Sequence, residues 1–200
     1  MSKFFKKLRG WGSGPGTLAV LVVGAILGAI FFASVGSFMV YANSEHFCAT
    51  SCHEMTTLKQ EHKGTIHDVN RTGVRATCND CHVPHEYIPN YLAKLGLLSD
   101  IWGHYVTHSI DTKEKFEAKR YQLARRVWVD MKHNDSRECR YCHTTAKMDP
   151  EKQTEKAKSR HEKGRLEGLT CIECHFAIAH KEPDGEGPRE LFSTKAARKE

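Results

Sequence analysis

The chain has 200 residues, 40% of them hydrophobic and 27% charged, and a formal net charge of +6. This length suffices for one modest folded domain and one additional segment. Four positive charges (Lys3, Lys6, Lys7 and Arg9) precede the first acidic residue, Glu45, so six minus four leaves only +2 for the remainder. So small a balance provides no single-sign face and argues against a nucleic-acid-binding protein.

The N-terminal part of the chain predicts a membrane anchor. Residues 10–44 carry no charge, and the 26 residues from 17 to 42 are almost wholly apolar. As a helix they would span about 39 Å, enough to cross a hydrocarbon core of about 30 Å. The alternative is a cleaved signal peptide, but its apolar region is usually only about 7–15 residues long. We therefore expect an uncleaved, single-pass anchor over 17–42.

The flanking charges predict the orientation of this anchor. The basic N-terminus, residues 1–16, should remain in the cytoplasm, which places everything after the span in the periplasm, bound to the bacterial inner membrane. Gly24 and Gly28 form a G-x-x-x-G pair inside the span, a spacing that lets two helices pack closely. A homodimer through the anchor is therefore one expectation, although glycine is common in membrane helices.

All eight cysteines fall in four pairs, each followed directly by histidine. The motifs are Cys48-Ala-Thr-Ser-Cys52-His53, Cys78-Asn-Asp-Cys81-His82, Cys139-Arg-Tyr-Cys142-His143 and Cys171-Ile-Glu-Cys174-His175. Three read C-x-x-C-H, and the first has one extra residue between its cysteines. Two thiols at this spacing can form thioethers with the two vinyl groups of one haem, and the next histidine can bind its iron.

Zinc and disulfides are the competing interpretations of the four motifs. Paired C-x-x-C sites are also typical of zinc ribbons, but zinc gives no reason for histidine to follow every second cysteine. With histidine at 13 of 200 positions, four coincidences have a probability on the order of 10⁻⁵. Four local disulfides would join nothing distant in the chain. We therefore expect four covalently bound haem c groups.

The segments between the motifs predict helices and loops, with no convincing strand. Apolar residues recur at helical spacing over 88–105 and again over 116–131. We expect a mainly α, loop-rich multihaem cytochrome c domain over 43–180, in which the haems form much of the core. The charged, Gly- and Pro-bearing segment 181–200 is expected to be a mobile tail.

The local strings resemble the NapC/NirT/NrfH family of membrane-anchored tetrahaem cytochromes, and NapC-like members in particular. The resemblance covers roughly residues 15–185. The matching strings are Phe47-Cys…Cys-His-Glu-Met55, Asn70-Arg-Thr-Gly-Val-Arg-Ala-Thr-Cys78, Cys81-His-Val-Pro-His85-Glu, Lys115-Phe-Glu-Ala, Glu138-Cys-Arg and Cys174-His…Ile178-Ala-His180-Lys. The widened first motif departs from the family, which usually has C-x-x-C-H there, and this puts the seating of the first haem in doubt.

The resemblance also implies second axial ligands, taken from the nine histidines outside the motifs. Its candidates are His67, His85, His161 and His180. By similarity to NrfH, His180 is expected opposite His143 and His67 opposite His175. For the haem of His82 the alternatives are Lys94, as in NrfH, and His85 or His161. Histidine is chemically easier, because a lysine must first lose its proton.

The expected quinol site lies at the first haem. His53-Glu54-Met55 matches a family variant in which methionine binds the iron in place of the motif histidine; the alternative is that His53 binds and Met55 only packs. The first motif follows the anchor closely, which places its haem near the membrane surface where quinol arrives. The resemblance adds Lys94 and Asp100 as quinol-site candidates. Six residues apart on one helix, they do not share a face unless the helix breaks, and Gly96 lies between them.

The resemblance implies a quinol dehydrogenase that takes electrons from membrane menaquinol or ubiquinol and passes them to a periplasmic reductase. NapC-like strings favour nitrate reductase; the alternative is an NrfH-like donor to nitrite reductase or another terminal reductase. A terminal haem enzyme would need a haem with an open distal pocket, typically at a modified motif such as C-x-x-C-K, and the sequence has none. A haem-storage protein would have no use for the anchor.

Overall fold

A computed structural model describes residues 15–197 and separates the chain into two units, the first ending at Ser44 and the second beginning at Glu45. The described part of the first unit is dominated by α2 (Pro15–Ala42), a helix of 28 residues without a charged side chain. Its apolar stretch is not buried by the rest of the protein. This helix is long and apolar enough to cross a bilayer, consistent with a single-pass membrane anchor. The predicted cytoplasmic segment 1–16 lies mostly outside the described residues.

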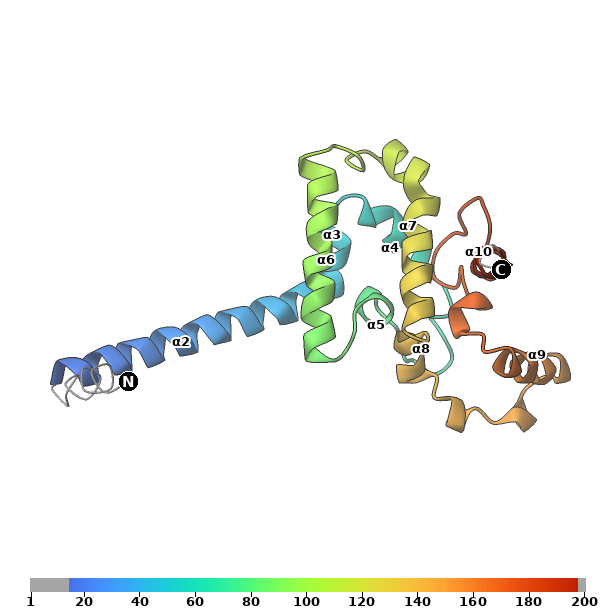
Figure 1. Ribbon diagram of the computed structural model, residues 1–200, viewed down its shortest axis with the longest axis horizontal. Helices are drawn as coiled ribbons and strands as arrows, with labels where there is room; N and C mark the ends of the chain where they lie inside the picture. The colour runs from blue at the N-terminus through green and yellow to red at the C-terminus, as the bar shows by residue number, and fades with distance from the viewer. Residues whose placement is uncertain (1–14, 198–200) are drawn as a thin grey trace. The chain divides into compact units, whose positions relative to one another are not determined.

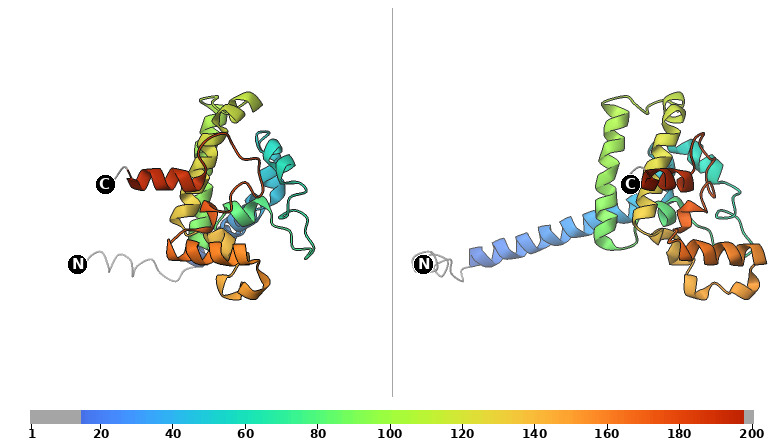
Figure 2. Two further views of the ribbon diagram at one scale, coloured as in Figure 1. Left: turned by 90° about the vertical axis from the view of Figure 1, so that its right-hand side faces the viewer. Right: turned by 45° about the vertical axis from the view of Figure 1, so that its right-hand side comes forward.

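The second unit is built from short helices around two longer ones, and residues 15–197 contain no β-strand, as the sequence predicts. The elements are α3 (Glu45–Thr50), α4 (Met55–His62), α5 (Cys78–His82), α6 (Tyr87–Tyr105), α7 (Lys113–His133), α8 (Arg137–Cys142), α9 (Glu155–Leu166) and α10 (Pro188–Ala197), with 3-10 turns η1 (Thr145–Lys147), η2 (Pro150–Lys152) and η3 (Cys171–Glu173). Figures 1 and 2 show α6 and α7 running in opposite directions, joined by the loop over residues 106–112.

The two long helices confirm the predicted helical periodicity over 88–105 and 116–131. Pro89 lies in the first turn of α6, where a missing N–H costs no helical hydrogen bond. α7 begins at an N-cap, Thr112, whose side chain accepts a hydrogen bond from the Lys115 N–H at 3.3 Å. α6 continues unbroken through Gly96, so the break that would bring Lys94 and Asp100 onto one face does not occur.

The protein core of the second unit is small. Its main cluster consists of Trp128 from α7, Ile172 from η3 and Leu191 from α10. The segment 181–200, predicted as a mobile tail, contains α10 in its described part, and α10 packs on η3 with Leu191 buried in the core. The segment before α10 also fits closely: a Cβ atom at Gly185 would lie 2.5 Å from the Tyr121 ring. The charged, Gly- and Pro-bearing composition of this segment gives no sign of these contacts.

Candidate functional site

Each of the four motifs has its first cysteine in a helical turn. Cys48 lies in α3, Cys78 and Cys81 in α5, Cys139 and Cys142 in α8, and Cys171 in η3. Residues three apart in a helical turn lie on the same side of it. The C-x-x-C spacing therefore directs both thiols of a motif to one side, as two thioethers to one group require.

Two of the motifs are fixed by capping boxes that the sequence analysis missed. At the second motif, the carboxylate of Asp80 accepts hydrogen bonds from the N–H and the hydroxyl of Thr77, both at 2.7 Å. At the fourth, Glu173 accepts the Thr170 N–H at 2.7 Å and its hydroxyl at 3.1 Å. The shared string T-C-x-[D/E]-C-H is the sequence signal of this arrangement. It holds the turn that carries each cysteine pair.

The motifs follow one another in space in the order in which they occur in the chain. α3 packs against α5, and α5 packs against α8. Among the thiols, Cys78 lies close enough to Cys48, and Cys139 close enough to Cys171, for their charges to interact. The second unit therefore presents a line of four motifs whose ends are the first and the fourth.

Three motif histidines face a second imidazole from elsewhere in the chain. The ring centres are 6.1 Å apart for His82 and His180, 6.2 Å for His67 and His143, and 5.9 Å for His161 and His175. Two metal–imidazole bonds of about 2 Å each, with ring centres about 1 Å further out, place two axial ligands about 6 Å apart. The interplanar angles range from 29° to 82°, and rotation about a shared axis allows all of them.

The surroundings of these pairs fit haem. At the second motif, burial and the neighbouring His180 lower the pKa of His82 to about 4, so its ring is neutral and able to bind a metal. The Nδ1 atoms of His67 and His180 are buried without a protein partner. At the fourth motif, a hollow of about 630 Å³ is lined by Cys174, His175 and His161.

The geometry pairs the histidines differently from the resemblance. His180 lies opposite His82, not His143, and His67 lies opposite His143, not His175. His161 lies opposite His175, and so is not beside His82. His85 stacks on Tyr141 instead, with ring centres 4.1 Å apart. Three of the histidines implied by the resemblance thus lie beside motif histidines, but beside other ones than it implies, because sequence order carries no information on which loops meet across the domain.

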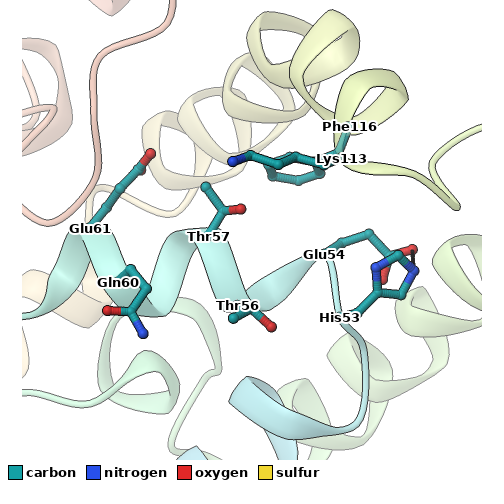
Figure 3. A pocket seen from close by; sticks show the side chains of 8 residues that line it. All are labelled: His53, Glu54, Thr56, Thr57, Gln60, Glu61, Lys113 and Phe116. Carbon is teal, nitrogen blue, oxygen red and sulfur yellow. Dashed lines mark ion pairs between the residues drawn. The ribbon is translucent and has the colours of Figure 1, made fainter.

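The first motif is built differently from the other three. The buried carboxylate of Glu54 lies between two imidazoles: its Oε1 is 3.3 Å from His53 Nε2 and 2.5 Å from His104 Nδ1. The two rings are 5.3 Å apart, closer than in any of the three pairs above. His53 and Glu54 line a hollow of about 630 Å³ together with Thr57, Lys113 and other residues, as Figure 3 shows. His53 thus meets a carboxylate in addition to a second ring.

Met55, the alternative ligand at this motif, begins α4 and is half-buried. It directly follows Glu54, whose carboxylate occupies the side of His53 that would bind iron. His53 and Met55, the two candidate ligands, are therefore the two sequence neighbours of Glu54.

Lys94 and Asp100 both lie beside the first motif, although α6 is unbroken. Burial lowers the pKa of Lys94, and its charge interacts with the Cys48 thiol. Burial raises the pKa of the Asp100 carboxyl, and its charge acts on Cys52. Each of the two side chains is therefore within electrostatic range of a different cysteine of the first motif. Lys94 and Asp100 therefore need not share a face of α6 to act near the first motif.

The family model described as "NapC/NirT cytochrome c family, N-terminal region" matches residues 13–185. The chain belongs to this family. It is 44% identical over 183 residues to the cytochrome c-type protein NapC of Escherichia coli, which covers 90% of each chain. It is 47% identical over 167 residues to the denitrification system component NirT of Stutzerimonas stutzeri, covering 83% of this chain and 82% of NirT.

A further relative, from Allochromatium vinosum and described with the words "tetraheme cytochrome-c type", is 45% identical over 166 residues, covering 83% of this chain and 88% of the relative. No solved structure matches the chain. This NapC/NirT-family chain is a multihaem c-type cytochrome that carries electrons and has an N-terminal membrane helix. Its eight cysteines are consistent with four haem motifs.

Behind His180, the NapC/NirT-family chain has an ion-pair cluster that the sequence analysis also missed. Glu61 of α4 binds the Arg120 guanidinium of α7 through both oxygens, at 2.8 and 2.9 Å, and accepts the Lys181 N–H at 3.0 Å. Burial raises the pKa of Glu61, but the bonds from Arg120 and Lys181 outweigh it and lower the pKa overall. Arg120 also binds Glu117 at 2.7 Å. Because these partners are 59 and 120 residues from Glu61, no local sequence motif predicts the contacts.

Proposed function

We propose that this chain is a quinol dehydrogenase and electron relay, which oxidises membrane menaquinol or ubiquinol and passes the electrons to a periplasmic reductase. The observation that carries the proposal is the position of Lys94 and Asp100 beside Cys48 and Cys52, at one end of the line of motifs. A proton acceptor at that end suits a donor that loses two protons with its two electrons. The membrane helix places the chain where quinol is found.

Four haem c groups, held by the eight motif cysteines, are part of this proposal. Each haem, when bound, supplies an iron that accepts and returns one electron. His82 with His180, His143 with His67, and His175 with His161 would close both axial positions, which excludes small molecules from these irons. This donor set suits transfer between proteins and not reduction of a substrate such as nitrite.

At the first motif we propose Met55 as the axial ligand, with His53 held by Glu54. Asp100 would accept a proton from quinol, and Lys94 would hydrogen-bond a quinol oxygen. The N-terminus would lie in the cytoplasm and the haem unit in the periplasm, attached to the inner membrane.

The reductase at the far end is proposed from the relatives. The similarity to NapC favours periplasmic nitrate reductase; the second candidate is a donor to nitrite reductase or another terminal reductase, since NirT is a component of a denitrification system. Purification of the chain in mild detergent, followed by identification of the reductase that remains bound, tests this choice.

Reconstitution of the holoprotein in liposomes tests the quinol step. Vesicles containing menaquinol or ubiquinol should reduce the haems, measured by their visible absorption, and vesicles containing the matching quinone should not. Haems that stay oxidised with both quinols would refute the proposal. If the reduced protein alone consumed nitrite, the chain would instead be a terminal reductase.

A further inference from the structure

The outer side of α6 is an unbroken apolar surface. Helical spacing usually turns such a stripe toward a protein core, but here it faces outward, and Figures 1 and 2 show α6 at an edge of the second unit. Leu95 and Trp102 are each 60% exposed and Tyr87 is 86% exposed. We call this surface the apolar face of α6; its members include Tyr87, Ile88, Leu92, Leu95, Leu98 and Trp102.

The polar groups of α6 lie away from this face. At about 100° per residue, the six residues named above fall within an arc of about 140°, which contains no charged side chain. Asn90, which is buried, and His104, which is hydrogen-bonded to Glu54, point to the interior of the unit. Lys94 and Asp100, the two charged residues of α6, lie toward the first motif. The helix is therefore two-sided: one side is apolar except for Ser99, and the charged side chains lie outside it.

Aromatic side chains stand at both ends of the apolar face, Tyr87 and Tyr91 in the first turns and Trp102 and Tyr105 in the last two. All four are exposed. Tyrosine and tryptophan are enriched where protein meets the boundary between lipid headgroups and acyl chains, because one part of each ring system is apolar and another can hydrogen-bond. This distribution is more typical of a lipid-facing helix than of a helix that pairs with protein.

The chain itself keeps a bilayer within reach of α6. The apolar helix α2 ends at Ala42, and the second unit begins at Glu45. A unit tethered by so few residues stays at the membrane surface. The nearest apolar medium for an exposed stripe of this size is then the outer leaflet.

We propose that α6 is a second, interfacial membrane contact: it lies in the headgroup region of the outer leaflet with its apolar face toward the acyl chains. This inference rests on the proposed function, because it explains how a lipid-soluble quinol would reach Lys94 and Asp100. A quinol moving along the leaflet would meet a helix that carries Lys94 at the edge of its apolar face and Asp100 further round. A second copy of the chain is the competing occupant of the face.

Site-specific photo-crosslinking of the full-length holoprotein in liposomes tests this proposal. p-Benzoylphenylalanine is introduced at Leu95, and, as a matched control, at Leu166, which is 78% exposed near the end of α9. After irradiation, mass spectrometry should find acyl-chain adducts at position 95, roughly tenfold more than at position 166. Equal yields at the two positions, or a cross-linked dimer through position 95, would overturn the proposal. Because no quinol is required, the result is independent of the proposed oxidation.

A charged variant provides a second test. Leu95→Glu should slow reduction by long-chain menaquinol in liposomes roughly tenfold, because a carboxylate opposes insertion of the face. Reduction by a water-soluble quinol analogue in detergent should be unchanged, as should both rates in the control variant Leu166→Glu. Equal loss with both donors would mean that the substitution damages the quinol site itself, and an unchanged rate with menaquinol would mean that the face does not enter lipid; either result contradicts the proposal.

Discussion

His82 and His180 face each other with ring centres 6.1 Å apart, although one follows the second cysteine pair and the other lies near the C-terminus. The neighbouring ring contributes to the low pKa of His82, about 4. An iron bound by both imidazoles would join the first half of the second unit to its C-terminal part. Such a bond stabilises a domain with little protein core, because it links distant parts of the chain.

This pairing predicts which histidine substitution alters the second haem. His180→Ala should convert one of the four haems from a low-spin, bis-histidine form to a form with a weak or missing sixth ligand. His85→Ala should leave all four unchanged, because His85 stacks on Tyr141. Magnetic circular dichroism and electron paramagnetic resonance distinguish these forms. The reverse result, with His85→Ala altering the haem, would restore the alternative drawn from the family resemblance.

The buried ion pair between Lys132 and Glu173 predicts a stability effect. Glu173 is 4% exposed and holds the turn of the fourth motif, with Lys132 Nζ at 2.5 Å. Lys132→Met should lower the free energy of unfolding by about 3 kcal/mol, because it leaves the buried carboxylate without its partner. Lys158→Met, at a pair whose glutamate is 81% exposed, should cost less than about 1 kcal/mol. Denaturant unfolding followed by circular dichroism measures both; equal losses would contradict the assignment.

The same pair predicts a pH dependence. Burial raises the pKa of Glu173, but the bonds from Lys132 and Thr170 outweigh it, so the pKa lies below the ordinary value of 4.5. A carboxyl whose pKa is lower in the folded state stabilises the protein fully above its unfolded pKa, and this contribution is lost as the pH falls through the folded pKa. Stability should therefore fall below about pH 4.5, and less steeply in Glu173→Gln.

The sequence was sufficient for those parts of the structure that depend on local spacing. Hydropathy predicted the anchor, periodicity predicted α6 and α7, and cysteine spacing predicted the four motifs. The pairing of His67 with His143 was not predictable, because it depends on which loops meet across the domain. The contact of Glu54 with His104 is equally non-local, at a separation of 50 residues. The packing of α10 rests on a few apolar side chains, Pro188, Leu191 and Phe192, in a segment whose composition is otherwise that of a tail.

The cluster behind His180 predicts a shift in reduction potential. Glu61 places a negative charge next to the segment that carries His180, and a nearby negative charge favours the oxidised, more positive form of an iron. Glu61→Gln should therefore raise the midpoint potential of one haem by tens of millivolts. Glu117→Gln is the matched control, because Glu117 binds the same arginine, whereas the Lys181 N–H donates to Glu61. If a redox titration found the midpoint potential shifted equally in both variants, the effect would be assigned to Arg120.

At the first motif, substitution of Met55 and substitution of His104 should affect the haem spectrum differently. If Met55 binds the iron while Glu54 holds His53, then Met55→Leu should change the absorption and magnetic circular dichroism of one haem. His104→Leu removes the hydrogen bond to Glu54 and the ring contact with His53 but no proposed ligand, so it should leave the ligand bands in place. A spectrum untouched by Met55→Leu would eliminate methionine ligation and assign the iron to His53.

Asp100 predicts how quinol oxidation depends on pH. Burial raises the pKa of this carboxyl above its ordinary value of 3.8, so it gains a proton at a higher pH than a free aspartate. Only the ionised form can accept a proton from quinol, so the rate of haem reduction by menaquinol in liposomes should fall as the pH is lowered through that pKa. Asp100→Asn should be roughly 100-fold slower and should lose this acid limb. Asp130→Asn, an exposed aspartate on α7, should retain both the rate and the limb. An Asp100→Asn protein with the wild-type rate and the wild-type acid limb would show that another group takes the proton.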